Sequence, residues 1–169
     1  MLKLYENVYI YQKEGNSDMT VDKLGDHWLG RFVPYLVYRI TNQFNRSLRK
    51  RLKRSGINIG RWRVLAVLKD NGRMNIGQIV DRTIIEQPTV SRIVAQLERE
   101  GLVYRETSDE DSRFVQVMLT QAGERAFGEI YPTATKHEEQ ALQGFSKQEI
   151  KTLISFLERI QNNIEPGSQ

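Results

Sequence analysis

The most informative segment of this chain is EQPTVSRIVAQLEREGLVYRETSDEDSRFVQVMLT, residues 86–120. Apolar residues recur at helical spacing from Val90 to Leu97, as on one face of an α-helix. Pro88 suits a first helical turn, where its missing N–H has no helical partner to lose. Gly101 follows at a position where helices commonly end on glycine. The first part of the segment therefore predicts a helix.

Polar side chains lie near the N-terminal end of this predicted helix, opposite its apolar stripe. A recognition helix presents its N-terminal residues to the major groove of DNA, where such groups contact phosphates and base edges. We therefore expect DNA contacts from the polar residues Gln87, Thr89, Ser91 and Arg92, and from Pro88 among them. An ordinary solvated helix face carries the same residue types, so the helix by itself leaves both interpretations open.

A β-hairpin is predicted next, because the runs 102–105 and 114–119 are rich in residues that favour strands. Its polar tip, 108–113, lacks the glycine that a stable tight turn favours. Arg113 is a candidate for the DNA minor groove, whose negative potential attracts guanidinium groups. The neighbouring acids, Asp111 among them, are expected to hold this arginine by paired hydrogen bonds. A solvated charge cluster is the alternative.

A shorter helical pattern lies just upstream, at 76–82, and residues 83–86 connect it to the first helix described above. The predicted order is then helix, turn, helix, strand, wing and strand. This is the order of a winged helix-turn-helix. We therefore predict a mainly α protein with a small β-wing, in the α+β class.

These motifs resemble the multiple-antibiotic-resistance regulator (MarR) family of transcription regulators. The resemblance extends from about Leu29 to Ile164. Two residues depart from the family pattern: Glu86 replaces the usual capping Ser or Thr, for which Glu is a poor substitute, and Ile84 replaces a common turn Gly. The matching motifs are IGRWRVL (59–65), PTVSRIV (88–94), LEREGLVYR (97–105), DSR (111–113) and VMLTQAG (117–123).

Two long amphipathic patterns flank the predicted winged helix, from Val33 to Leu52 and from Ile150 to Ile164. Their apolar residues exceed what a small winged helix covers, which indicates a partner surface. The resemblance implies a homodimer that places two reading helices about 34–36 Å apart on a palindromic site. The predicted organisation is an N-terminal arm at 1–26, dimerisation helices at 27–57 and 120–165, and a winged helix-turn-helix domain at 58–119.

Two local signals mark the C-terminal helices. Ser146 and Glu149 have the spacing of a capping box, which predicts a helix start. Pro132 lies inside the helical pattern that precedes them and is expected to kink it.

Composition narrows the functional classes. The 169 residues carry a formal net charge of +4 and no cysteine, so disulfides and thiolate metal sites are excluded. Eleven Lys or Arg and no Asp or Glu lie between Arg31 and Lys69, which suits phosphate contact or a solvated helix end. With only His27 and His137 as histidines, a metal site is not expected. No 18-residue apolar run or secretion signal is present, so we expect a cytoplasmic protein without membrane association.

Enzymatic motifs and phosphate-binding glycine loops are absent from the sequence, so neither catalysis nor a cofactor is expected. The resemblance implies instead a small effector, often an aromatic acid, between the dimer helices and the DNA-binding lobe. Arg39 is the natural partner for a carboxylate. Packing in an ordinary core is the alternative for these residues. The candidate positions are Leu36, Val37, Tyr38, Arg39, Ile40, Phe44, Trp62 and Leu65.

Three functional hypotheses follow. The one we favour is a homodimeric, sequence-specific repressor of double-stranded DNA that a small molecule releases from its operator. The second is a constitutive architectural DNA-binding protein with little sequence preference. The third is a winged-helix module that binds another protein, for which DNA affinity would not depend on Arg92 or Arg113.

Overall fold

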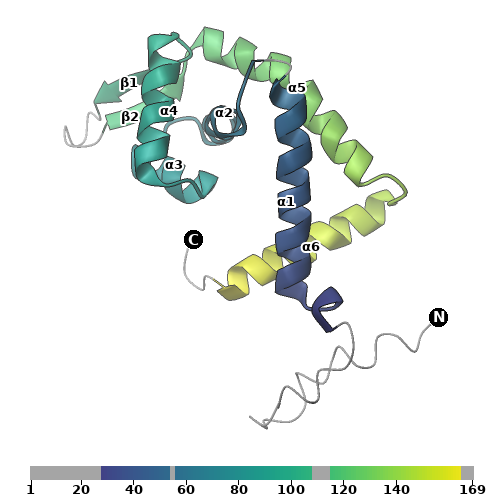
Figure 1. The fold of residues 1–169 in the computed structure, drawn as a ribbon. Helices are drawn as coiled ribbons and strands as arrows, with labels where there is room; N and C mark the ends of the chain where they lie inside the picture. The colour runs from purple at the N-terminus through teal and green to yellow at the C-terminus, as the bar shows by residue number, and fades with distance from the viewer. Residues whose placement is uncertain (1–27, 54–55, 108–114, 165–169) are drawn as a thin grey trace. The chain divides into compact units, whose positions relative to one another are not determined.

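The computed structural model describes residues 28–53, 56–107 and 115–164 (Figure 1). They form two compact units, the first ending at Arg46 and the second beginning at Ser47. The mainly helical fold with a two-stranded wing confirms the predicted class. The elements are a short 3-10 helix (Trp28–Gly30), α1 (Val33–Leu52), α2 (Ile59–Asn71), α3 (Ile76–Thr83), α4 (Gln87–Arg99), β1 (Val103–Thr107), β2 (Val115–Leu119), α5 (Gln121–Ala141) and α6 (Lys147–Ile164).

The first unit contains the 3-10 helix and most of α1. Pro34 is the second residue of α1, in the first helical turn, where a proline is tolerated. The rings of Trp28 and Phe32 pack at a centroid separation of 5.5 Å. Large apolar side chains are exposed in this unit: Trp28, Leu29, Phe32, Val33, Val37, Tyr38 and Ile40.

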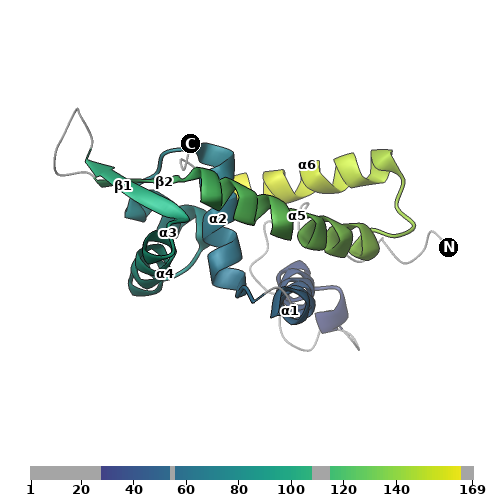
Figure 2. The ribbon, with the colours of Figure 1, turned by 90° about the horizontal axis from the view of Figure 1, so that it is seen from above.

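The core of the second unit lies beneath the helix-turn-helix. Helices α2, α3 and α4 pack against one another, and the hairpin packs at their side (Figure 2). Burial of aliphatic side chains drives this packing. The fully buried residues come from every one of these elements and from the end of α1: Leu52, Val64, Leu65, Leu68, Ile79, Val90, Val94, Leu97, Val103 and Val117.

The wing is an antiparallel pair in which Val103 lies opposite Leu119 and Thr107 opposite Val115. Met74, in the loop between α2 and α3, adds a third strand position. Its N–H donates to the Val117 carbonyl at 3.2 Å, and the Val117 N–H donates back at 2.8 Å. The base of the hairpin is therefore bonded on both sides of β2, a feature that the sequence did not predict. The predicted tip, 108–113, lies outside the described residues.

Helices α5 and α6 follow the wing. Pro132 lies inside α5, and Figure 1 shows this helix in two segments of different direction, as expected. The predicted capping box is confirmed: Ser146 N–H donates to Glu149 Oε2 at 2.7 Å, and Glu149 N–H donates to Ser146 Oγ at 3.2 Å. Helix α6 has no buried residue, and its exposed apolar side chains are Ile154, Phe156, Leu157, Ile160 and Ile164.

Within the described ranges, none of the helices combines the length and the apolar character that a bilayer span requires.

Candidate nucleic-acid interface

The helix-turn-helix begins with a well-capped α3. Asn75 Oδ1 accepts from Gln78 N–H at 2.9 Å, and Gln78 Oε1 accepts from Asn75 N–H at 2.8 Å. The helix ends at Thr83, whose hydroxyl donates to the Ile79 carbonyl at 2.6 Å. Ile84 then takes the left-handed conformation, with φ 52° and ψ 47°. Sequence thus places a branched residue where the turn backbone favours glycine.

The N-terminus of α4 has no side-chain cap among the described residues. Glu86 occupies the N-cap position, and its carboxylate makes no capping hydrogen bond. Pro88 stands in the first turn, as the sequence predicted. No described side chain therefore accepts a capping hydrogen bond from the first turn of α4, and the positive end of a helix dipole attracts anions such as a phosphate.

The two faces of α4 differ as the sequence predicted. Val90, Ile93, Val94 and Leu97 are buried against the core. On the other side, Gln87, Pro88 and Arg92 are exposed, while Thr89 and Ser91 are half-buried. All five candidate residues thus gather in the first two turns, although their contact with DNA stays a prediction. The two wing candidates, Asp111 and Arg113, lie outside the described residues.

Two ion pairs involve residues of the first wing strand, β1. Arg105 Nε lies 3.4 Å from Glu98 Oε2, and Arg73 lies 3.7 Å from Glu106. Exposed pairs of this kind contribute little to stability, about 0–1 kcal/mol. They link Arg73, in the loop before α3, and Glu98, on α4, to residues of β1.

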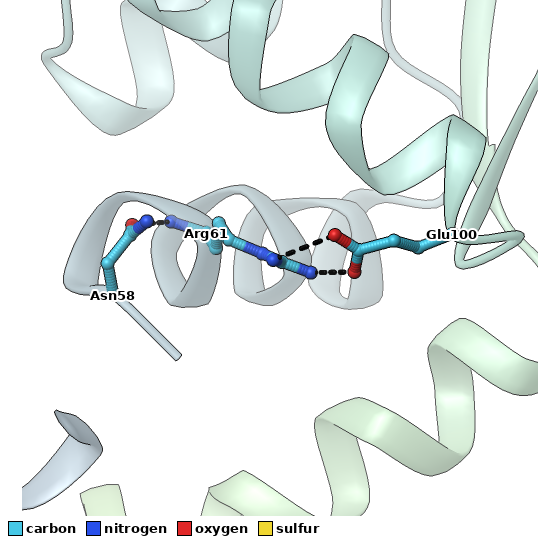
Figure 3. A network of polar contacts seen from close by, with 3 residues as sticks. All are labelled: Asn58, Arg61 and Glu100. Atoms are coloured by element: carbon cyan, nitrogen blue, oxygen red, sulfur yellow. Dashed lines mark hydrogen bonds and ion pairs between the residues drawn. The ribbon is translucent and has the colours of Figure 1, made fainter. Parts of the chain in front are cut away.

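The C-terminal end of α4 is tied to α2 by a less exposed ion pair (Figure 3). Asn58 caps α2 by accepting from Arg61 N–H at 2.9 Å. The Arg61 guanidinium then reaches Glu100 with two parallel hydrogen bonds, of which the Nη1–Oε1 bond is 3.0 Å long. The Arg61 side chain is 17% exposed and the Glu100 side chain is 46% exposed, so water screens the guanidinium less than it screens Arg73 and Arg105, while it still reaches the carboxylate. Sequence reasoning missed the pair, because its members are 39 residues apart.

Replacing Arg61 with methionine is expected to lower the free energy of unfolding by about 1.5–3 kcal/mol, the range for hydrogen bonds to charged groups. The variant leaves the Glu100 carboxylate at the negative end of the α4 dipole. Chemical denaturation measures the change. The matched control is Arg73→Met, which removes the exposed pair with Glu106 and should cost less than 1 kcal/mol. Equal losses in the two variants would contradict the structural role assigned to Arg61.

Hydrogen bonds at the junction between the wing and α5 hold the backbone that follows α4. Thr120 N–H donates to the Leu102 carbonyl at 3.0 Å, and the Thr120 hydroxyl donates to the Gly101 carbonyl at 2.6 Å. The same hydroxyl oxygen accepts from Gly123 N–H at 3.0 Å and so caps α5. The LTQAG segment, residues 119–123, therefore joins the end of α4 to α5. The sequence alone did not reveal this role.

Arg51, in the basic run of the first long helix, makes a structural contact. Its guanidinium donates to Gln140 Oε1 at 2.5 Å, which joins the end of α1 to α5 within the second unit. His137 lies one helical turn before Gln140 on α5 and is buried, with an exposure of 7%. Burial, together with the positive charge of Arg51, holds the pKa of His137 below its ordinary value.

Stability is therefore expected to fall as the pH drops below about 6.5, the ordinary histidine pKa. Unfolding frees His137 to bind a proton that the folded state resists, so the unfolded state gains protons first. The slope has a limit of about 1.4 kcal/mol per pH unit for one proton. Thermal unfolding from pH 7.5 to 5.5 measures it, and His137→Gln should flatten the profile. An unchanged profile in that variant would overturn the assignment.

The candidate effector residues divide between the two units. Trp62 is half-buried on α2 and stacks on Phe127 of α5, with centroids 5.3 Å apart and planes inclined by 8°; Tyr131 continues the row at 5.5 Å. Leu65 is fully buried in the core. In the first unit, Leu36 and Phe44 are half-buried, whereas Val37, Tyr38, Arg39 and Ile40 are exposed. Sequence analysis did not identify Phe127 or Tyr131, the aromatic neighbours of Trp62.

Comparison with known proteins agrees with this geometry. Residues 55–113 match the MarR family model. The HTH-type transcriptional repressor IacR of Pseudomonas putida is 27% identical over 134 residues, which cover 79% of this chain and 80% of that protein.

Solved structures extend the similarity. A MarR-family transcriptional regulator from Silicibacter pomeroyi has a TM-score of 0.78 at 29% identity, covering 89% of this chain and 99% of its own. BpsR of Bordetella bronchiseptica shares the fold at 22% identity, with a TM-score of 0.70 and coverage of 82% and 99%. The fold, the sequence motifs and the relatives agree, and the winged helix-turn-helix of this chain is similar to that of MarR-family transcription regulators.

Proposed function

We propose that this protein is a homodimeric repressor that binds a palindromic DNA operator through α4 and releases it when a small aromatic acid binds. The observation that carries the DNA-binding proposal is the uncapped N-terminus of α4. There, polar side chains gather on the surface while the opposite face of the helix is held by the core. A reading helix needs this combination, because a rigid support fixes the side chains that face the base edges. Repression is supported by the relationship to IacR.

Dimerisation is supported separately by each unit. Helix α6 exposes five large apolar side chains, and the described part of the first unit, from Trp28 onward, exposes seven. Where such exposed apolar side chains gather into large patches, they mark association sites. A two-fold dimer would cover these side chains and present two copies of α4 to two half-sites of the same duplex.

An aromatic effector is supported by the row formed by Trp62, Phe127 and Tyr131, which lies partly open on the second unit. Aromatic rings favour offset stacking with further rings. Such a ligand must bind the state that cannot bind DNA more tightly than the state that can, because otherwise it shifts no population. DNA binding by BpsR is regulated by 6-hydroxynicotinic acid, which is therefore the first compound to test.

Fluorescence anisotropy of the protein on its own upstream intergenic DNA, against a scrambled duplex at near-physiological salt, tests the proposal. We expect a preference of about 10³-fold or more, with two chains bound per operator. Addition of 6-hydroxynicotinic acid or related aromatic acids should then lower the anisotropy. Equal binding to a random duplex library and to the intergenic DNA would favour the architectural alternative. No binding to any duplex would favour the protein-interaction module.

A further inference from the structure

Ile84, in the turn between α3 and α4, combines two unfavourable features. It is the one non-glycine residue with positive φ in the described part of the chain. For a β-branched side chain the left-handed conformation is sterically strained. The same side chain is 90% exposed, so its packing contacts within the protein are too few to offset this strain. Neither the backbone nor the core of this unit explains an isoleucine here.

The position of Ile84 connects it to the reading surface. Its N–H donates to the Val80 carbonyl at 2.9 Å and closes α3, so the turn backbone is held in place. The next residue, Ile85, packs against the core, which anchors the turn on the other side. Two residues later α4 begins with the exposed Gln87 and Pro88. Ile84 therefore exposes apolar atoms in the turn that leads directly into the helix from which DNA is proposed to be read.

We propose that Ile84 is a specificity-determining residue that contacts the C5-methyl group of a thymine in each operator half-site. This inference rests on the proposed DNA-binding function. Among the groups that base pairs present in the major groove, the thymine methyl is the apolar one, and an aliphatic side chain is its natural partner. Backbone strain that the folded protein does not offset is typical of functional sites. At such a site the compensating interaction forms only when the ligand binds.

The experiment tests whether one thymine methyl group on the DNA contacts the side chain of Ile84. The highest-affinity duplex is first selected from a random library with the wild-type protein. Each thymine in turn is then replaced by deoxyuracil, which removes only the C5-methyl, and anisotropy measures the dissociation constant. For the wild-type protein we expect a loss of about fivefold at one thymine per half-site, as for the exposure of one methyl group to water.

Two variants complete the cycle. Ile84→Gly relieves the strained backbone and should raise the melting temperature, while its affinity for the selected duplex falls by about fivefold or more. The deoxyuracil penalty at the sensitive thymine should vanish in this variant. Ile84→Asn, which tolerates the left-handed conformation but lacks the aliphatic group, should lose the same penalty.

Each outcome decides the proposal. A deoxyuracil penalty that disappears with Ile84→Gly and Ile84→Asn, but persists at other sensitive thymines, supports a direct contact. A penalty that stays unchanged in both variants overturns it, as does a wild-type protein that selects a duplex yet tolerates deoxyuracil everywhere. In those two cases the proposed DNA-binding function still stands. Failure of the wild-type protein to select any duplex would overturn both.

Discussion

Replacing Gly123 with alanine is expected to lower the free energy of unfolding by about 3 kcal/mol or more, the upper range for overpacking. A Cβ atom at this position would lie 2.0 Å from the Leu102 carbonyl oxygen and 3.0 Å from its carbonyl carbon. Both atoms belong to the backbone, which cannot move aside as a flexible side chain can. The backbone of Leu102 is held on both sides. Its N–H donates to the Leu97 carbonyl at 2.9 Å, and its carbonyl accepts from Thr120 N–H at 3.0 Å.

Thermal unfolding followed by circular dichroism measures this loss, and a decrease in melting temperature of roughly 6–12 °C is expected for a chain of this size. The matched control is Gly128→Ala, in the same helix, where an added Cβ meets nothing within 4 Å. That substitution should stabilise the protein by about 0.5–1 kcal/mol, because glycine is unfavourable inside a helix. If both variants melted near the wild-type temperature, the close approach of α5 to Leu102 would be contradicted.

The second large effect is expected on DNA binding. Combining Gln87→Ala with Arg92→Ala should lower affinity for the selected duplex by about 100-fold or more, since each good base contact contributes about 1–3 kcal/mol. Both side chains are exposed near the N-terminal end of α4, so their removal should leave the melting temperature almost unchanged. Anisotropy on the selected and scrambled duplexes measures the effect.

The control for this pair is Arg99→Ala, because Arg99 is an exposed arginine in the last turn of the same helix. Its loss should change affinity by less than about tenfold and by the same factor on both duplexes, as for a phosphate contact or none. A parallel loss on both duplexes in the double variant would favour the architectural hypothesis. Undiminished affinity in the double variant would remove α4 from the DNA interface.

Local patterns in the chain predicted most of the secondary structure. The spacing of Val90, Ile93, Val94 and Leu97 predicted the buried face of α4, and the buried side chains confirm it. Gly101 has φ 69°, as expected of a glycine at the end of a helix. Ser146 and Glu149 form the predicted capping box. These features depend on contacts within one or two helical turns, so short segments are sufficient to predict them.

Features that join distant segments were decided only by tertiary packing. Arg61 and Glu100 meet across 39 residues, and Arg51 and Gln140 across 89. Met74 completes the wing from a loop that carries no strand pattern, and Gly123 is required because the Leu102 carbonyl approaches α5. The strain at Ile84 likewise appears only when the turn is seen in three dimensions. Residue type and spacing indicate which side chains face the core, whereas their partners depend on how whole helices pack, and that arrangement is a property of the folded chain.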